Sequence, residues 1–213
     1  MRRRLRSLRS ATTAAGFTLV ELAIVLAIIA LLAVAVLKGQ TVVDQAVAAE
    51  AVAAIKDLRA AVATFRQRYR YLPGDFPVDG TNPEISGVSP SCRIGGASAG
   101  NGNGSVEPGE SACASEHLIR ADLVKGDPAL PIRTRQGDVI LVRSANSGSV
   151  APFSAQVLNV LVLGNIPCDV ALEIDRKIDD GDLSAGAVRA SQNNAYCTAP
   201  ANVKNPVSLA AAL

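Results

Sequence analysis

One uninterrupted apolar segment, residues 17–37, dominates the N-terminal part of the chain. A helix needs about 20 apolar residues to cross a bilayer, and this segment has that length. Glu21 is its only charged residue. An acid inside a membrane helix costs roughly 2.5–3.5 kcal/mol on insertion scales, which makes it a functional residue by default. The pattern therefore predicts a transmembrane helix with a functional carboxylate near its start.

The polar–apolar pattern changes after Lys38 and becomes amphipathic over residues 41–70. Apolar residues recur there at spacings of three and four, which indicates one buried helical face: Val47, Ala51, Ile55, Leu58, Val62, Phe65 and Tyr69. Gly39 predicts a bend, because glycine weakens a helix interior by about 1 kcal/mol relative to alanine. Pro73 and Gly74 are expected to end the helix.

The remaining residues, 72–213, predict a globular domain of mixed elements. We expect a long loop over 78–115, a helix over 116–125, a strand over 138–143, a buried strand or a helix over 156–164, a helix over 167–178, a turn over 178–182, a last strand over 187–191 and a loop from Ala195. A long helix followed by a few strands predicts an α+β fold, with the helix packed on a small antiparallel sheet.

The charge distribution indicates topology. The five arginines among residues 1–16 are accompanied by no acid, and positive charge beside a spanning segment keeps that end in the cytoplasm. All four cysteines lie on the opposite side, where an even count favours two disulfides. Of the three possible pairings we predict Cys92–Cys113 and Cys168–Cys197, because each closes a local loop.

The segment Gly16-Phe17-Thr18-Leu19-Val20-Glu21 resembles the processing site of type IV prepilins and type II secretion pseudopilins. The resemblance implies that a prepilin peptidase cuts after Gly16, that Phe17 is then N-methylated, and that Glu21 guides subunit docking. It extends weakly to residues 71–75, 100–104, 116–118 and 174–181.

The resemblance implies a domain plan of a leader (1–16), a transmembrane and filament-core helix (17–37), an amphipathic continuation (38–71) and a periplasmic pilin-like domain (72–213). The expected protein is a structural subunit, a minor one, of a type IV pilus or a type II secretion-like filament, and not an enzyme. Its expected partners are the prepilin peptidase, other pilin or pseudopilin subunits, the inner-membrane assembly platform and the membrane. Nothing in the sequence points to nucleic acid.

Several alternatives stay open at this point. Ala33–Ala35 could be the cleavage box of an ordinary secretory signal, or the apolar segment could be a plain uncleaved anchor. The domain could be a membrane-anchored periplasmic binding or sensor module that does not polymerise, or an exported hydrolase if Ser, His117 and Asp side chains cluster. Glu21 could pair with the amine of Phe17 in its own chain or in a neighbouring subunit. The filament system is also open.

Two oxygen-rich segments are candidates for a metal, although no cofactor is required. Asn101, Asn103 and Glu110 partly match a calcium loop, but Ala99 occupies the first ligand position and cannot coordinate. The second segment is the acidic turn Asp175, Asp179, Asp180 and Asp182, for which a solvated turn is the simpler interpretation. No C-x-x-C spacing is present, which disfavours zinc, and His117 is expected at the surface.

Overall fold

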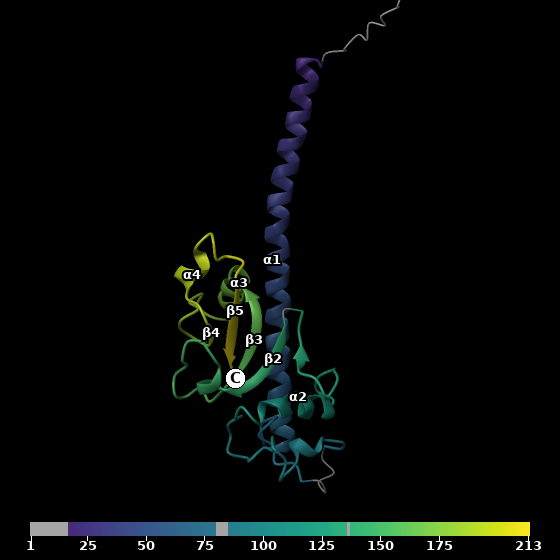
Figure 1. Ribbon diagram of the computed structural model, residues 1–213, viewed down its shortest axis with the longest axis vertical. Coiled ribbons are helices and arrows are strands. Elements are labelled where there is room, and N and C mark those ends of the chain that lie inside the picture. Colours follow the sequence, from purple (N-terminus) through teal and green to yellow (C-terminus); the bar gives the residue numbers. More distant parts are fainter. Residues whose placement is uncertain (1–16, 80–84, 136) are drawn as a thin grey trace, which may run out of the picture. The chain divides into compact units, whose positions relative to one another are not determined.

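The computed structural model of the protein describes residues 17–79, 85–135 and 137–213 (Figure 1). The chain divides into two compact units, the first ending at Val42 and the second comprising Val43–Leu213. The long helix α1, Leu19–Tyr69, contributes residues to both units. The predicted single helix across the apolar and amphipathic segments is therefore present, and it continues through Gly39.

In the first unit, every side chain from Phe17 to Val36 is exposed. The part Leu19–Val36 is long enough and apolar enough to cross a membrane. Soluble proteins rarely expose a continuous apolar surface of this extent. An apolar environment, either lipid or other apolar helices, is therefore needed around this part of α1.

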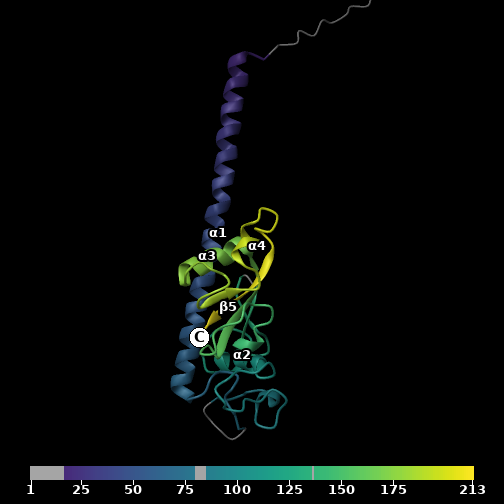
Figure 2. The same ribbon diagram turned by 90° about the vertical axis from the view of Figure 1, so that its left-hand side faces the viewer.

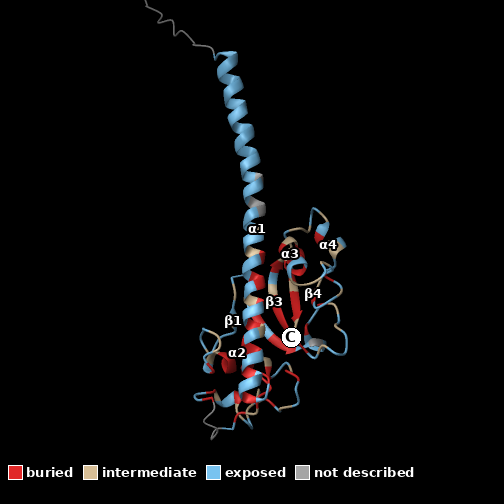
Figure 3. Ribbon diagram, turned by 180° about the vertical axis from the view of Figure 1, so that it is seen from behind, coloured by how far each residue is buried: buried red, intermediate tan, exposed pale blue. Residues whose placement is uncertain are grey.

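In the second unit, one face of α1 is buried, as the spacing predicted (Figure 3). Of the predicted face, only Val47 is partly exposed, and the other six residues are buried. Phe65 is fully buried and its ring lies beside those of Tyr69 and Phe76. Arg70 follows the helix with a φ of 68°, a left-handed conformation that commonly ends a helix. Pro73 and Gly74 then exclude any continuation.

The sheet of the second unit has five antiparallel strands in the order β1-β2-β3-β5-β4. The strands are β1 (Ile132–Arg133), β2 (Asp138–Arg143), β3 (Asn159–Pro167), β4 (Val188–Ala190) and β5 (Pro206–Ala212). One face, which includes Leu141, Leu161 and Leu209, shares a single core with α1. Residues of the other face, such as Val160 and Val162, pack in a smaller cluster with Val150. The predicted α+β, pilin-like fold is confirmed.

The described residues of the unit form three further helices: α2 (Ser111–Arg120), α3 (Cys168–Ile178) and α4 (Asn194–Thr198). Two short 3₁₀ segments lie at Pro90–Cys92 and Ser144–Asn146. Figures 1 and 2 show α3 and α4 together at one end of the sheet and α2 toward its other end. The disulfides Cys92–Cys113 and Cys168–Cys197 join these pieces, with Cα–Cα distances of 5.6 Å and 5.0 Å. This is the pairing predicted from the sequence.

Three predicted elements were wrong in type or position. The helix expected over 116–125 begins at Ser111 and ends at Arg120, because Asp122 adopts a left-handed φ of 58°. The strand near Ala187 is not the last one, since β5 follows it, and the tail from Ala195 is not a loop. Alanine is depleted in strands, so Ala210–Ala212 gave no strand signal. Its pairing with β3 and β4, where small side chains fit between buried layers, decides its conformation.

Candidate functional site

A capping box between Thr18 and Glu21 closes the N-terminal end of α1. The Thr18 hydroxyl accepts a hydrogen bond from the backbone N–H of Glu21 at 3.2 Å. Glu21 Oε2 accepts from the Thr18 N–H at 3.0 Å and from the Thr18 hydroxyl at 3.1 Å. The Thr-x-x-Glu spacing is the sequence signal of this motif, which was not among the features predicted from the sequence. Gly16, the predicted cleavage position, lies outside the described residues.

The capping box places the Glu21 carboxylate one turn from Phe17, at an exposed helix start. Phe17 itself is 84% exposed. A carboxylate at the N-terminus of a helix is stabilised by the helix dipole. The structure thus provides a local role for Glu21 while leaving it accessible to a second partner.

The predicted calcium residues Asn101, Asn103 and Glu110 lie in one loop, where their oxygens accept backbone N–H groups. Glu110 Oε1 accepts from Asn101 at 3.1 Å and its Oε2 accepts from Glu107 at 3.0 Å. The side-chain oxygens of Asn101 and Asn103 accept from the backbone two residues further on, at 3.0 Å and 2.8 Å. These contacts close the loop, and calcium binding here stays a prediction.

Asp75, which the sequence indicated only as a turn residue, is the buried centre of this loop. Its Oδ1 accepts from the Asn103 N–H at 3.0 Å and its Oδ2 from the Gly104 N–H at 2.8 Å. Burial raises the pKa of Asp75, and its backbone donors, Gly104 and Asn103, partly oppose the rise. Burial also raises the pKa of Glu110, and the N–H groups of Glu107 and Asn101 partly oppose that rise. A Cβ at Gly100 would lie 2.3 Å from the Asp75 carbonyl carbon, so only glycine allows this close packing.

The sequence predicted His117 at the surface, and this prediction was wrong: the residue is fully buried. Its Nδ1 accepts a hydrogen bond from the Gly74 N–H at 3.0 Å, and its ring lies parallel to that of Phe65. Its Nε2 has no hydrogen-bond partner in the described part of the chain. Burial lowers the pKa of His117 to about 4. Neither ring nitrogen is bonded to a Ser or Asp side chain among the described residues, so the geometry gives the hydrolase alternative no support.

Acidification should destabilise the second unit through His117. The imidazole has a pKa of 6.5 in the unfolded chain and about 4 when folded, so below pH 6.5 the unfolded state binds more protons. At 1.36 kcal/mol per pH unit, the free energy of unfolding should fall by about 3 kcal/mol down to pH 4. His117→Asn keeps an acceptor near Gly74 but cannot titrate.

The measurement is the difference between the wild-type and His117→Asn unfolding profiles, recorded by urea denaturation from pH 7 to pH 4. The difference matters because burial raises the pKa of Asp175 to about 7, so protonation of this carboxyl changes stability in the opposite direction over the same range. Parallel profiles for the two proteins would contradict the prediction.

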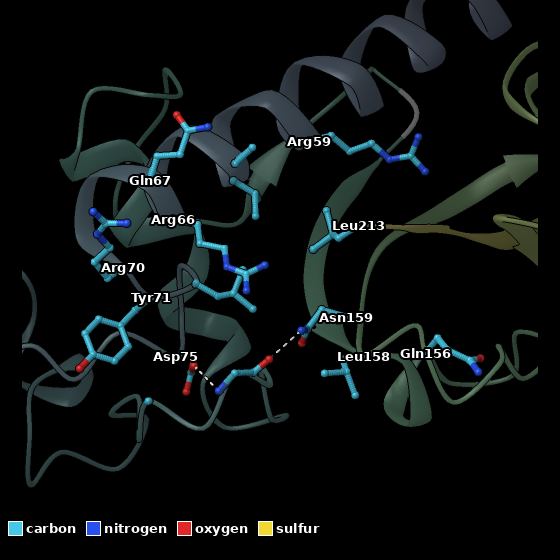
Figure 4. Close-up of a pocket in the computed structure, with 15 residues that line it drawn as sticks. Arg59, Arg66, Gln67, Arg70, Tyr71, Asp75, Gln156, Leu158, Asn159 and Leu213 are labelled. Atoms are coloured by element: carbon cyan, nitrogen blue, oxygen red, sulfur yellow. Dashed lines mark hydrogen bonds between the residues drawn. The ribbon is translucent and has the colours of Figure 1, made fainter.

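A groove of about 770 Å³ lies between the last turns of α1 and the start of β3 (Figure 4). One side of the groove is lined by Arg59 and Arg66 of α1 and by Arg70, which directly follows the helix. The other side is lined by residues of the segments 102–104 and 156–159, which include Gln156, Leu158 and Asn159. Asp75 and Asn159 lie at its base, linked through Gly104 by hydrogen bonds of 2.8 Å and 3.0 Å. The groove is therefore basic along α1, and the polar side chains at its base are hydrogen-bonded to the protein.

The acidic turn predicted from sequence is assembled at the C-terminal end of α3. One carboxylate oxygen from each of Asp175, Asp179 and Asp180 lies within 4.8 Å of the others. Burial, followed by the negative charges of Asp180, Asp179 and Asp182, raises the pKa of Asp175 to about 7. The turn is therefore not simply solvated, because its first acid belongs to the core.

The start of α1 is apolar, exposed and capped by Thr18 and Glu21, and the second part of α1 belongs to an α+β domain. These features define a pilin-like architecture. Residues 12–37 match the family model described as the prokaryotic N-terminal methylation motif. The chain thus carries the signal of type IV prepilins and pseudopilins, and the resemblance of residues 16–21 is confirmed. No curated protein and no solved structure matches the chain.

Proposed function

We propose that this chain is a structural subunit, a pilin or pseudopilin, of a type IV pilus or a type II secretion-like filament. The observation that carries the proposal is the coincidence of the methylation motif at residues 12–37 with the exposed apolar part of α1, Leu19–Val36. Cleavage after Gly16 by a prepilin peptidase and methylation of Phe17 would give the mature subunit. The minor-subunit role belongs to the same proposal.

The apolar part of α1 would serve first as a membrane anchor and later as part of the filament core. Both surroundings are apolar, so moving the leucines, isoleucines and valines between them changes little hydrophobic free energy. The N-terminus would lie in the cytoplasm and Val43–Leu213 in the periplasm, supported by the arginines among residues 1–16. The two disulfides agree with an oxidising compartment for this unit.

Glu21 would give the assembly its register. Cleavage after Gly16 creates an ammonium group on Phe17, and this group has no bulk water in an apolar bundle. A buried charge without a partner is strongly destabilising, so an incoming subunit would dock where its Phe17 amine meets a Glu21 carboxylate. The capping box supports this proposal, because it holds the carboxylate at an exposed helix start.

The test of the proposed processing is the intact mass and N-terminal sequence of membrane-extracted protein. We expect a chain that begins at N-methylated Phe17. Gly16→Leu should keep the leader, since a bulky side chain blocks the cleavage position, whereas Gly39→Leu, a matched change outside the motif's cleavage position, should be processed normally. A start at Met1 or after Ala35 in the wild-type protein would contradict the proposal.

A membrane-anchored binding module that does not polymerise is the second candidate, and the basic groove favours it. Arg59, Arg66 and Arg70 would suit a negatively charged ligand. The two candidates differ in processing and assembly, because a plain anchor needs neither cleavage after Gly16 nor Glu21. Filament incorporation of the processed chain therefore decides between them.

A further inference from the structure

The acidic turn gathers more negative charge than the surrounding chain neutralises. Asp175, Asp179 and Asp180 present oxygens within 4.8 Å of one another, and Asp182 adds a fourth carboxylate to the same turn. Arg59 is the basic side chain whose charge acts on Asp179, but the two form no ion pair in the described part of the chain. Like charges held this closely repel each other unless a cation or a proton lies between them.

Asp175 provides an observation that is independent of the clustering. It is fully buried, and neither of its carboxylate oxygens makes a hydrogen bond of normal geometry among the described residues. The backbone N–H of Gly181 only partly opposes the rise that burial causes in the Asp175 pKa. Buried carboxylates in proteins are normally hydrogen-bonded, paired with a cationic side chain or coordinated to a metal. In the described part of the chain Asp175 has no cationic partner and no hydrogen bond of normal geometry, and one of its oxygens lies in the group formed with Asp179 and Asp180.

Neighbouring segments hold the turn in place. Asp179 Oδ2 accepts from the backbone N–H groups of Ala187 and Val188, at the start of β4. A Cβ at Gly186 would collide with this oxygen, so glycine is required for the close approach. The Asn194 side chain accepts from the Leu183 N–H and donates to a carbonyl within the turn, both through 2.8–2.9 Å bonds.

The end of α3 adds to the negative potential. The helix finishes at Ile178, and its last carbonyl groups and its dipole favour a positive charge at this end. The Cys168–Cys197 disulfide connects α3 to α4, the helix that begins with Asn194. The carboxylates are therefore presented by a cross-linked frame, so little ordering remains to oppose binding of an ion.

We propose that the acidic turn is a divalent-cation site, with Asp175, Asp179 and Asp180 as ligands and Ca²⁺ as the ion. All three ligands are oxygens, which hard cations prefer. Three carboxylate oxygens that all lie within 4.8 Å of one another are close enough to bind a single ion at the usual 2.3–2.6 Å bond lengths of Ca²⁺. Mg²⁺ binds at about 2.1 Å with near-ideal octahedral geometry and usually keeps several waters, so a group of protein carboxylates suits the more flexible coordination of Ca²⁺ better.

The bound ion would hold Asp179 in place and so reinforce its hydrogen bonds from the end of α3 to the start of β4. The site lies outside the filament-core helix and does not depend on the filament role. Calcium binding and filament assembly can therefore fail separately in an experiment.

The test is isothermal titration of the full chain in detergent with CaCl₂, after removal of metal with EDTA, together with thermal unfolding in EDTA, CaCl₂ or MgCl₂. We expect one calcium site and a higher melting temperature with Ca²⁺ than with Mg²⁺. Asp175→Asn and Asp180→Asn should each weaken calcium binding by about tenfold or more, since affinity follows the charge and number of ligands. Asp57→Asn, which removes an exposed acid of α1, should bind like the wild type.

The variants also separate ligand loss from misfolding. In EDTA, Asp175→Asn should be at least as stable as the wild type, because it removes the repulsion, yet calcium should no longer raise its melting temperature. Absence of calcium binding by the wild type, or wild-type binding by Asp175→Asn, would overturn the proposal. Equal stabilisation by Mg²⁺ would overturn the assignment to calcium.

Discussion

Replacing Glu21 by Val is expected to abolish incorporation into filaments while membrane insertion and cleavage after Gly16 continue. Insertion should be as good or better, because the substitution removes the only charge in an otherwise apolar segment. Docking should fail, because the incoming Phe17 ammonium loses its partner where water cannot replace it. Leaving such a charge unpaired costs about 3–5 kcal/mol, which is roughly a hundredfold to several thousandfold in the docking equilibrium. Glu21→Asp should be intermediate, and Glu21→Gln should resemble the Val variant.

The capping box provides the control for this experiment. Thr18→Val removes the hydroxyl that bonds to Glu21 and keeps the carboxylate. Loss of a cap costs about 1 kcal/mol of helix stability, so this variant should assemble nearly as well as the wild type if Glu21 acts by docking. The measurement is sheared or cross-linked filament, normalised to processed protein in the membrane.

Two results would assign Glu21 a purely local role. Wild-type assembly of Glu21→Val would show that the carboxylate is not needed for docking. Equal loss of assembly in Thr18→Val and Glu21→Val would show that helix capping is what assembly requires. Either outcome would leave the methylation motif intact and remove the register mechanism.

Removal of the two disulfides should lower the free energy of unfolding of the second unit more than any other change proposed for it. They close loops with sequence separations of 21 and 29 residues. Restricting the unfolded chain over such loops stabilises the folded state by roughly 3 kcal/mol for each bond. Because the bonds join different helices, the effects of Cys92→Ala/Cys113→Ala and Cys168→Ala/Cys197→Ala should add. Together they remove a large part of the stability that a domain of this size normally has, about 5–15 kcal/mol.

The measurement is urea unfolding of the full chain with each pair replaced, with both replaced, and with dithiothreitol added to the wild type. Non-reducing peptide mapping supplies the connectivity. A Cys92–Cys168 peptide, four free thiols, or an unchanged unfolding midpoint under reduction would contradict the prediction. Only the second pair should also weaken calcium binding, because it holds α4 and Asn194 beside the acidic turn.

The elements that the sequence determined by itself are those governed by periodicity and local chemistry. The apolar run of residues 17–37 and the buried face of α1 follow from spacing, and Pro73 with Gly74 marks the end of that helix. The β-branched residues of β2 and the turn after α3 were likewise predicted correctly from local sequence. The methylation motif is local as well, because it consists of consecutive residues, 12–37.

The tertiary structure decided what depends on partners distant in sequence. β5 is alanine-rich and has little strand propensity, and it becomes a strand because β3 and β4 supply its hydrogen bonds. The sequence alone suggests that His117 is an exposed polar residue. In the structure it is buried against Phe65 and Gly74, which are distant from it in the sequence. Asp75 likewise becomes a core acceptor only when residues 102–104 fold over it.

The acidic turn shows the same division most clearly. The sequence placed Asp175, Asp179, Asp180 and Asp182 near one turn, because i and i+4 positions share a helix face. It could not show that Asp175 faces the core while Asp180 faces solvent, since burial depends on where α3 packs against the sheet. Local sequence fixes which groups are neighbours, and packing fixes their dielectric surroundings, so the chemistry of this carboxylate was decided by the fold.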